Sequence, residues 1–320
     1  MKRILVTGAG GFIGHHLTKF LVRAGHWVRG VDIKYPQYEP TLAQEFQLLD
    51  LRRWPNCLQA TREVEEVYSF AANMGGVEFL KGHRAEIMHD NALIDLHMLE
   101  AARLNGVIKF LYTSSACVYP GYRQNTANVT PLMEEDAYPA DAEDGYGWEK
   151  LFAERQCWHY YEEYGLETRV VRFHNIFGPL GTYHGGREKS PAAICRKIAL
   201  ARREDEIEVW GDGEQTRSYC YIDDCVEGIY RLMASDYPKP INLGQDRMVS
   251  INELVEIVAK IAGKKIKKRY ELTKPQGVRG RNSDNTRPRQ VLQWEPKVSL
   301  EKGLEATYWW VHEQLMKLDS

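Results

Sequence analysis

A tyrosine and a lysine four residues apart, Tyr146-x-x-x-Lys150, have a spacing that could do chemistry. On a helix the two side chains lie one turn apart on the same face. The ammonium favours the phenolate, so we expect a lowered pKa that lets Tyr146 act as a base near neutral pH. A second copy begins at Tyr270, but it lies in a β-like stretch that runs into Pro275, so its side chains would not share a helical face. Only the first copy follows a strand that ends in hydroxyl residues, where Ser115 can hydrogen-bond the same substrate oxygen as Tyr146.

A glycine-rich segment, Gly8-Ala9-Gly10-Gly11-Phe12-Ile13-Gly14, directly follows the first predicted strand and enters a helix. A tight turn, a close approach of backbone to a pyrophosphate and close helix-to-strand packing each exclude a β-carbon, and the helix N-terminus offers free N–H groups to phosphates. Glycine spacing alone is a weak signal, but the strand before it, the helix after it and an acid at the end of the second strand make it specific. The segment predicts a dinucleotide site with contacts from Gly8, Gly11, Phe12, Ile13 and Gly14.

Asp32 ends the second predicted strand and indicates which dinucleotide binds. Its carboxylate can accept both ribose hydroxyls of NAD, whereas a 2′-phosphate would be repelled, with Lys34 but no arginine beside it. NAD is therefore favoured over NADP. Asp50 and Leu51, after the third strand-like run, fit an adenine-edge contact, and Asp50 fits a solvated loop acid equally well. Near the reaction centre, Tyr146 and Lys150 would also contact the cofactor, with the Lys150 ammonium on the nicotinamide ribose hydroxyls.

The elements that must position these residues alternate short β-branched runs with segments of helical period. Strand, helix, strand in that order predicts parallel βαβ units. We expect an α/β fold, a Rossmann-type doubly wound parallel sheet with a smaller C-terminal α/β substrate lobe. The NAD-binding domain should span residues 1–173, with 220–244 returning to it, and the nucleotide-binding substrate lobe should comprise 174–219 and 245–320. The predicted strands are 3–7, 27–33, 66–71, 109–113 and 168–173, and the predicted helices 14–24, 87–104, 146–164, 251–262 and 299–317.

Composition narrows the classes of function. The 320 residues carry 42 Lys and Arg against 44 Asp and Glu, a net charge of −2, so a dedicated nucleic-acid or membrane-surface binder is disfavoured. No apolar run approaches the roughly 18 residues of a membrane span, and the start of the chain lacks the apolar region of a signal peptide, so we expect a cytoplasmic protein. Six cysteines form no Cys-x-x-Cys pair and are expected as reduced thiols, and no metal site is predicted.

Several motifs together resemble the extended short-chain dehydrogenase/reductases that act on nucleotide sugars. The likeness spans nearly the whole chain and implies tightly held NAD, a sugar nucleotide in the C-terminal lobe, and a homodimer joined through two helices per subunit, here 87–104 and 146–164. It also adds Ala71 to the cofactor contacts. The motifs are the glycine segment, Ala71-Ala72, Asn91, Ser115, Tyr146-x-x-x-Lys150, the run 172–179 and Gly211-x-Gly213-x-Gln215-x-Arg217.

The residues after Ser115 indicate the reaction within this family. Sugar-nucleotide 4,6-dehydratases carry an Asp-Glu pair where Ala116 and Cys117 stand here, and Ala116 cannot protonate a departing hydroxyl. Simple 4-epimerases usually have a hydroxyl residue at the position of Cys117. A thiol there can be a base for the protons on C3 and C5 that a C4 ketone makes acidic, and a nearby nicotinamide would favour its thiolate. Lys189, in Gly185-Gly186-Arg187-Glu188-Lys189, is the expected partner acid.

Four stretches, 71–76, 114–120, 185–191 and 277–285, most closely resemble the GDP-mannose 3,5-epimerases of this family, whose base and acid fall on Cys117 and Lys189. Arginines fit a diphosphate because a guanidinium donates two parallel hydrogen bonds. His174 is expected to be a packed core residue, and Asn175 could instead cap a turn. The residues expected to bind the substrate are Met74, Gly75, Ser115, Cys117, Asn175, Lys189, Gln215, Arg217, Arg279 and Arg281.

The resemblance therefore implies an NAD-dependent isomerase that epimerises GDP-mannose at C3 and C5 through a transient 4-keto sugar, giving GDP-L-galactose and GDP-L-gulose. Tyr146, Lys150, Ser115, Cys117 and Lys189 would be its catalytic residues. Two alternatives stay open: a nucleotide-sugar 4-epimerase in which Cys117 is structural, and a non-catalytic NAD-sensing protein. The sensor is weakened by the intact Ser115, Tyr146 and Lys150.

Overall fold

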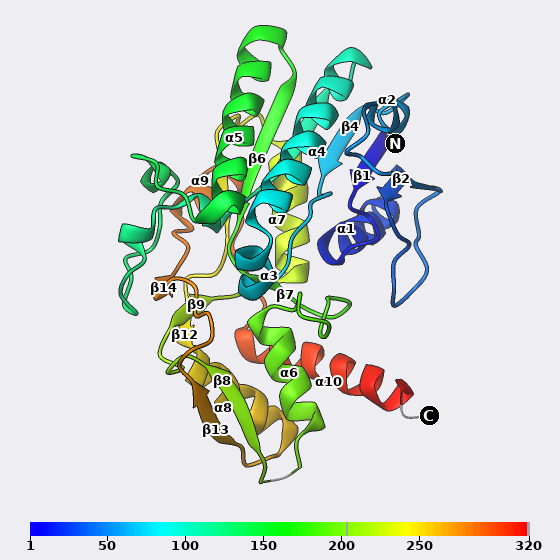
Figure 1. Cartoon of the computed structure of the whole chain (residues 1–320). Coiled ribbons are helices and arrows are strands. Elements are labelled where there is room, and N and C mark those ends of the chain that lie inside the picture. Colours follow the sequence, from blue (N-terminus) through cyan, green and yellow to red (C-terminus); the bar gives the residue numbers. More distant parts are fainter. Residues whose placement is uncertain (203, 319–320) are drawn as a thin grey trace.

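A parallel sheet of seven strands forms the larger part of the molecule (Figure 1) in the computed structural model, which describes residues 1–202 and 204–318. Its strand order is β11-β6-β5-β4-β1-β2-β3, and every neighbouring pair runs parallel. The predicted doubly wound fold is confirmed. The strands are β1 (Arg3–Thr7), β2 (Trp27–Asp32), β3 (Glu45–Leu48), β4 (Glu66–Ser69), β5 (Lys109–Ser115), β6 (Glu167–Phe173) and β11 (Ile241–Leu243).

Helices cover both faces of this sheet because successive strand residues point to opposite sides. In β1, Ile4 and Val6 join the core beneath α1 and α7, whereas Leu5 joins the core beneath α2, α4 and α5. Helix α5 ends at Gly165, which has the left-handed φ of +69° that a glycine tolerates. The helices of this half are α1 (Phe12–Arg23), α2 (Trp54–Ala60), α3 (Val77–Gly82), α4 (Arg84–Leu104), α5 (Asp144–Tyr164), α7 (Ile222–Ala234) and α9 (Thr286–Leu292).

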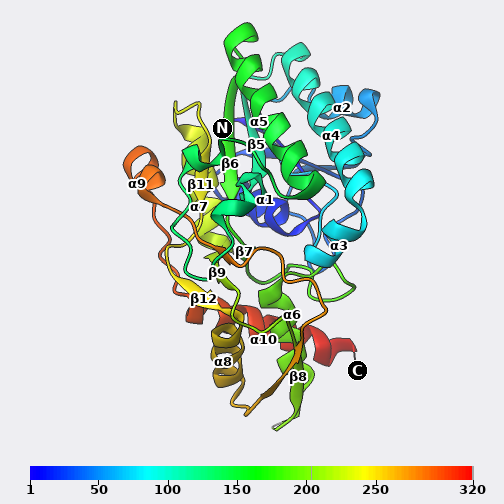
Figure 2. The ribbon, with the colours of Figure 1, turned by 60° about the vertical axis from the view of Figure 1, so that its left-hand side comes forward.

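A smaller lobe of short strands and three helices lies below the sheet, and in both ribbon views α6, α8 and α10 pack together there (Figure 2). Helix α8 begins with a capping box, since Ser250 Oγ accepts from the Glu253 amide and the Glu253 carboxylate accepts from the Ser250 amide. The elements are β7 (Ile176–Phe177), α6 (Ser190–Leu200), β8 (Glu206–Trp210), β9 (Thr216–Ser218), β10 (Cys220–Tyr221), β12 (Met248–Ser250), α8 (Ile251–Ala262), β13 (Lys267–Glu271), β14 (Gly280–Arg281) and α10 (Leu300–Leu318).

The strand order reverses at β1, whose neighbours are β2 and β4, and ligands of such folds bind beyond the carboxyl ends of the strands at this point. Strand β11 pairs with β6, so residues 241–243 lie in the sheet of the N-terminal half. The domain boundaries themselves stay a prediction, and positions 203, 319 and 320 of the expected substrate lobe lie outside the described residues.

All six cysteines are free thiols, as expected, and five of them are buried. Within residues 1–202 and 204–318, no helix is long and apolar enough to cross a membrane. The same part of the chain holds no group of three or more His, Cys, Asp or Glu side chains placed to bind a metal ion.

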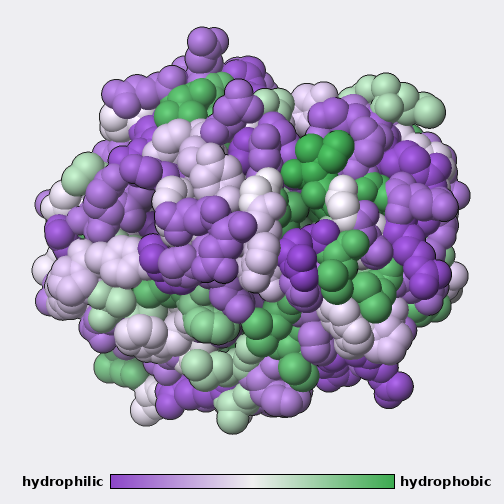
Figure 3. Space-filling model, turned by 90° about the horizontal axis from the view of Figure 1, so that it is seen from above, coloured by the Kyte–Doolittle hydropathy of each residue, from purple (hydrophilic) through white to green (hydrophobic). Residues whose placement is uncertain are grey.

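Seen from above the view of Figure 1, apolar side chains form several patches separated by polar ones (Figure 3).

Candidate active site

The glycine loop after β1 is shaped for a close approach of backbone to a ligand. Gly8 has a φ of +67°, and a β-carbon there would come within 2.7 Å of the Phe70 carbonyl. A β-carbon at Gly14 would overlap the carbonyl oxygen of Gly8, so helix α1 can begin this close to the turn only with glycine. The loop thus leaves open the cradle that the pyrophosphate of a dinucleotide requires, and these residues fit NAD.

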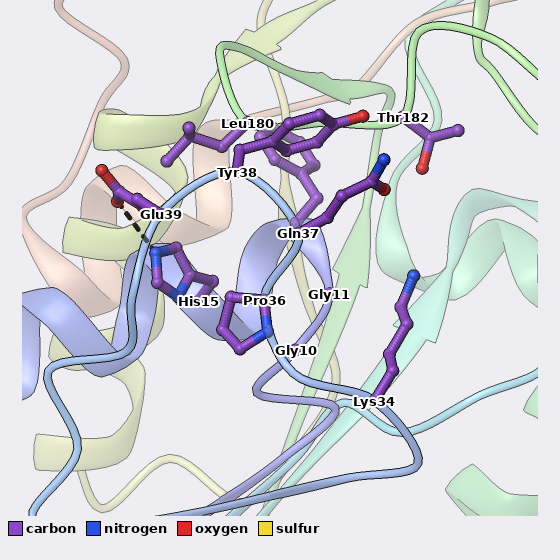
Figure 4. Close-up of a pocket in the computed structure, with 11 residues that line it drawn as sticks. Gly10, Gly11, His15, Lys34, Pro36, Gln37, Tyr38, Glu39, Leu180 and Thr182 are labelled. Atoms are coloured by element: carbon purple, nitrogen blue, oxygen red, sulfur yellow. Dashed lines mark hydrogen bonds and ion pairs between the residues drawn. The ribbon is translucent and has the colours of Figure 1, made fainter.

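Asp32 lies at the carboxyl end of β2, where its Oδ2 accepts from the Gly10 amide at 2.9 Å and its Oδ1 from the Ile33 amide at 2.7 Å. Burial raises the pKa of Asp32, and these amides oppose the rise. In Figure 4, Lys34 and Thr182 reach toward the same space beside Gly10 and Gly11. The predicted cofactor, NAD, is confirmed, and Lys34 also lines this pocket.

The other residues predicted to contact the cofactor, Asp50, Leu51 and Ala71, already make contacts within the protein. Both carboxylate oxygens of Asp50 accept from the Arg52 guanidinium, at 3.0 and 2.9 Å. The Leu51 side chain is buried in the core, so only its backbone could face a ligand. The Ala71 amide donates to Thr7 Oγ1 at 3.1 Å. A role for Asp50, Leu51 and Ala71 in adenine or nicotinamide binding therefore stays a prediction.

Ser115, Cys117 and Tyr146 come together where β5 ends in the short 3₁₀ turn Ala116–Val118. Ser115 Oγ accepts from the Cys117 amide at 3.2 Å, and its hydroxyl also hydrogen-bonds Tyr146, which lowers the pKa of the phenol. A β-carbon at Gly147 would overlap the carbonyl oxygen of Cys117, so helix α5 lies directly against this turn. Because residue 147 is a glycine, helix α5 comes close enough for Tyr146 to reach the end of β5.

The expected low pKa of Tyr146 is not what the protein alone provides. Burial raises the pKa of Tyr146 above its ordinary value, and the positive charge of Lys150 opposes the rise without reversing it. Lys150 itself is enclosed rather than free, with Asp95 and Glu149 within 3.6 Å of its ammonium, and these carboxylates raise its pKa. Neither acid was singled out from the sequence.

Arg281 contacts the Cys117 thiol and two further side chains, and its predicted role at a diphosphate stays a prediction. Its Nη1 lies 3.6 Å from Cys117 Sγ, its Nη2 donates to Glu143 Oε2 at 2.6 Å, and its Nε donates to Gln124 Oε1 at 2.6 Å. Burial raises the pKa of the thiol, Glu143 raises it further, and Arg281 lowers it. The charge beside the thiol thus comes from Arg281, and the surrounding protein favours the thiol over the thiolate.

Lys189 stands at the N-cap of α6, and its side chain makes no hydrogen bond or ion pair with any residue that the structure describes. Although its side chain is exposed to solvent, the protein around it lowers the pKa of Lys189. Arg281 adds to the lowering and the Cys117 thiolate opposes it, so the three groups share one electrostatic environment. An amine with a lowered pKa donates its proton more readily near neutral pH.

Arg187 fastens the Lys189 segment to the loop after β4, a contact that the sequence did not reveal. Its Nη1 donates to Asn73 Oδ1 and to the Met74 carbonyl, both at 3.2 Å, and its guanidinium lies 3.8 Å from the Phe79 ring centroid. This contact joins the predicted substrate residues Met74 and Gly75 to the segment that carries Lys189.

The other residues predicted to bind the substrate differ in how many of their polar groups already have a partner within the protein. Arg217 donates only to backbone carbonyls, and burial lowers its pKa to about 10. Arg279 forms an ion pair with Asp212 at 2.8 Å. Gln215 donates to the Trp210 carbonyl, but its Oε1 is buried and has no partner in the described structure. Asn175, at a φ of +49°, donates to the Ser218 carbonyl at 2.9 Å, which fits the alternative of a turn residue.

Two residues behave as the sequence indicated. His174 is buried, its Nε2 lies 3.0 Å from Asn242 Oδ1, and burial lowers its pKa to about 3, so it is a packed core residue. Tyr270 lies on β13 and is largely exposed, with its hydroxyl on Asn252 Oδ1 at 3.1 Å. The second Tyr-x-x-x-Lys copy is therefore not part of the site.

Known proteins match this chain over nearly its whole length. Residues 4–244 match the NAD dependent epimerase/dehydratase family. GDP-mannose 3,5-epimerase 1 of Oryza sativa subsp. indica is 48% identical over 317 residues, which cover 98% of this chain and 83% of that protein. The crystal structure of UDP-glucose 4-epimerase from Thermotoga maritima, with UDP-glucose, has a TM-score of 0.87 and 28% identity and covers 98% of this chain and 99% of that one. UDP-glucuronic acid 4-epimerase from Bacillus cereus, solved with UDP-glucuronic acid and NAD, has a TM-score of 0.82 and 25% identity over 98% and 99% of the two chains.

Proposed function

Because the chain belongs to the NAD dependent epimerase/dehydratase family, we propose that it epimerises GDP-mannose at C3 and C5 through a transient 4-keto sugar. The products are GDP-L-galactose and, when only C5 inverts, GDP-L-gulose. One observation carries the choice of reaction: the chain holds a thiol at Cys117 and an amine at Lys189 in one electrostatic environment, beside Tyr146 and Ser115. A simple 4-epimerase has no use for this second acid and base.

The cofactor site fits NAD, held by the glycine loop after β1 and by Asp32. When bound, NAD supplies hydride acceptance and return at C4, so the overall reaction is redox-neutral. Tyr146 accepts the proton of the C4 hydroxyl while Ser115 holds the same oxygen, and Lys150 places a positive charge behind the phenol.

The thiol and the amine act next, once C4 is a ketone and the protons on C3 and C5 are acidic. Cys117 removes a proton from one face of the sugar, and Lys189 returns one to the other face. Arg281 supports the thiolate that Cys117 needs for this step, because it is the cation nearest to the sulfur. Arg217, which has no carboxylate partner among the described residues, suits the diphosphate of the substrate.

The experiment is to incubate the protein with GDP-mannose in deuterated water and to locate the label in the sugar. We expect deuterium at C3 and C5 and its loss from both in Cys117→Ala, while oxidation at C4 stays detectable as NADH absorbance. Cys157→Ala is the matched control, because Cys157 is buried on α5. Turnover without label at C3 or C5 would make the protein a 4-epimerase, and no turnover would favour the sensor.

The proposal includes a homodimer joined through α4 and α5. These helices pack against each other. Large apolar side chains are exposed on both, among them Met88 and Leu96 on α4 and Trp148 and Phe152 on α5. A cytoplasmic location is also part of the proposal, since six free thiols are typical of a reducing compartment.

A further inference from the structure

Behind the Tyr146–Lys150 pair lies a buried group of charges to which the proposed reaction assigns no role. Lys150 Nζ is 3.5 Å from Asp95 Oδ2 and 3.6 Å from Glu149 Oε1. The exposed fractions of the Lys150, Asp95 and Glu149 side chains are 2, 5 and 1%. Asp95 reaches Lys150 because helices α4 and α5 pack against each other. Two carboxyl groups and one ammonium are thus enclosed together.

The two carboxyl groups are unequally satisfied. Asp95 Oδ2 accepts from the Tyr112 hydroxyl at 2.8 Å, and Glu149 Oε1 accepts from Asn91 Nδ2 at 2.8 Å. Glu149 Oε2 is buried and has no donor partner in the described part of the chain. Burying a carboxylate oxygen without a hydrogen-bond donor costs free energy, whereas a carboxylic acid can carry a proton on that oxygen and donate it in a hydrogen bond.

Asp95 and Glu149 approach the same ammonium, each within 3.6 Å of Lys150 Nζ, which makes the two carboxyl groups neighbours placed for one hydrogen bond between them. Two ionised carboxylates cannot form such a bond, because neither has a hydrogen to donate. Counting charges gives −1 for the enclosed group when both acids are ionised and zero when they hold one proton between them. We propose that Asp95 and Glu149 are positioning residues that share one proton, so that Lys150 presents its charge to Tyr146 from a neutral buried cluster.

The direction of the proton affinities agrees with this geometry. The pKa of Glu149 is raised to about 8 because burial and the nearby Asp95 together outweigh the opposing charge of Lys150. Burial also raises the pKa of Asp95, again against Lys150. The cluster therefore holds its shared proton at neutral pH and loses it in mildly alkaline solution.

Loss of the shared proton lowers the fraction of Tyr146 that is in the basic phenolate form. Lys150 lowers the pKa of Tyr146 and an ionised Glu149 raises it, so a second negative charge cancels the help of the ammonium. This consequence rests on the proposed function, in which Tyr146 takes the C4 proton. The titratable groups that face the two acids are Lys150, Tyr146 and Cys157 from α5 and Tyr112 from β5.

Infrared difference spectra of the NAD-loaded protein, taken between neutral and alkaline pH, test for the shared proton directly. The wild type should show the carbonyl stretch of a buried carboxylic acid at neutral pH. Glu149→Gln should lose it, and so should Asp95→Asn, because a single remaining carboxylate is neutralised by Lys150 and needs no proton. The matched control is Glu154→Gln, since Glu154 is equally buried on α5 but fully paired with Arg172, at 2.6 Å.

The pH dependence of kcat/KM supplies the second readout. The ratio of Glu149→Gln to wild type should rise by about tenfold between pH 7 and pH 9.5, the effect of one pKa unit at Tyr146. Glu154→Gln should lower stability and leave this ratio flat. A wild type without the acid band, or a band that persists in both Asp95→Asn and Glu149→Gln, would overturn the proposal. If the bands behave as expected but GDP-mannose is not turned over, the shared proton stands and the proposed function fails.

Discussion

Replacing Arg281 by methionine is the sharpest test of how the site activates Cys117. The substitution keeps most of the side-chain volume and removes the guanidinium that lies 3.6 Å from the sulfur. It also leaves Glu143 without the donor that now binds it at 2.6 Å. Both changes act in one direction, because Arg281 lowers the pKa of the thiol and Glu143 raises it.

The size of the effect follows from the distance. Unit charges about 4 Å apart interact by about 4 kcal/mol at an effective dielectric of about 20. At about 1.36 kcal/mol per pKa unit this corresponds to about 3 units, an upper bound because the guanidinium charge is spread out and shared with Glu143. We expect the pKa of the Cys117 thiol to rise by at least about one unit in Arg281→Met, and the thiolate fraction below that pKa to fall at least about tenfold.

Alkylation by iodoacetamide across pH measures this thiolate fraction, with mass spectrometry to locate the label. Cys117 should be the residue that reacts, because the other five cysteines are buried. The midpoint of the reaction rate should move to higher pH in Arg281→Met and to lower pH in Glu143→Gln. Arg279→Met removes a nearby surface charge that is paired with Asp212, and it should leave the midpoint unchanged. Equal midpoints in wild type and folded Arg281→Met would refute the electrostatic role of Arg281.

Two further predictions concern the cofactor and the dimer. Gly14→Ala puts a β-carbon onto the Gly8 carbonyl oxygen, so it should weaken NAD binding at least about tenfold, measured by calorimetry, and lower stability by about 1–3 kcal/mol. In the control Gly82→Ala the new β-carbon meets open space, so NAD binding should be unchanged. Phe152→Glu puts a charge on the exposed face of α5, so this variant should sediment as a monomer. The control is Ile108→Glu, whose side chain is similarly exposed but lies outside α4 and α5, and this variant should stay a dimer. A dimeric Phe152→Glu would exclude this interface.

The parts of the fold that could be predicted from the sequence are those with a long, regular pattern. Helices α4 and α5 have 21 residues each, and β5 and β6 have seven, so each element is long enough for many residues to indicate the same structure. Strand β3 has four residues and most strands of the smaller lobe have two to five, too few for alternation to show. Short strands depend on their partners in the sheet, which a local pattern does not contain.

The site divides in the same way. The positions of Tyr146, Lys150 and Ser115 follow from local order, because a strand end and one helix turn bring them together. The contact of Arg281 with Cys117 joins residues 164 positions apart, and that of Asp95 with Lys150 joins residues 55 apart. No spacing rule reaches that far, so the sequence indicated which cations to expect at the site but not which carboxylates lie beside them.

The five cations predicted for the site fall into two groups, according to whether a carboxylate of the protein lies beside them. Lys150, Arg279 and Arg281 each have a carboxylate partner within the protein. Lys189 and Arg217 have none among residues 1–202 and 204–318, and the protein around them lowers the pKa of both. A partly buried cation without a counter-ion, such as Arg217, is destabilised until an anion reaches it. We therefore expect a negatively charged sugar nucleotide to stabilise these two unpaired cations, Arg217 at the diphosphate and Lys189 at the sugar. The lowered pKa of Lys189 suits the proton transfer proposed for it.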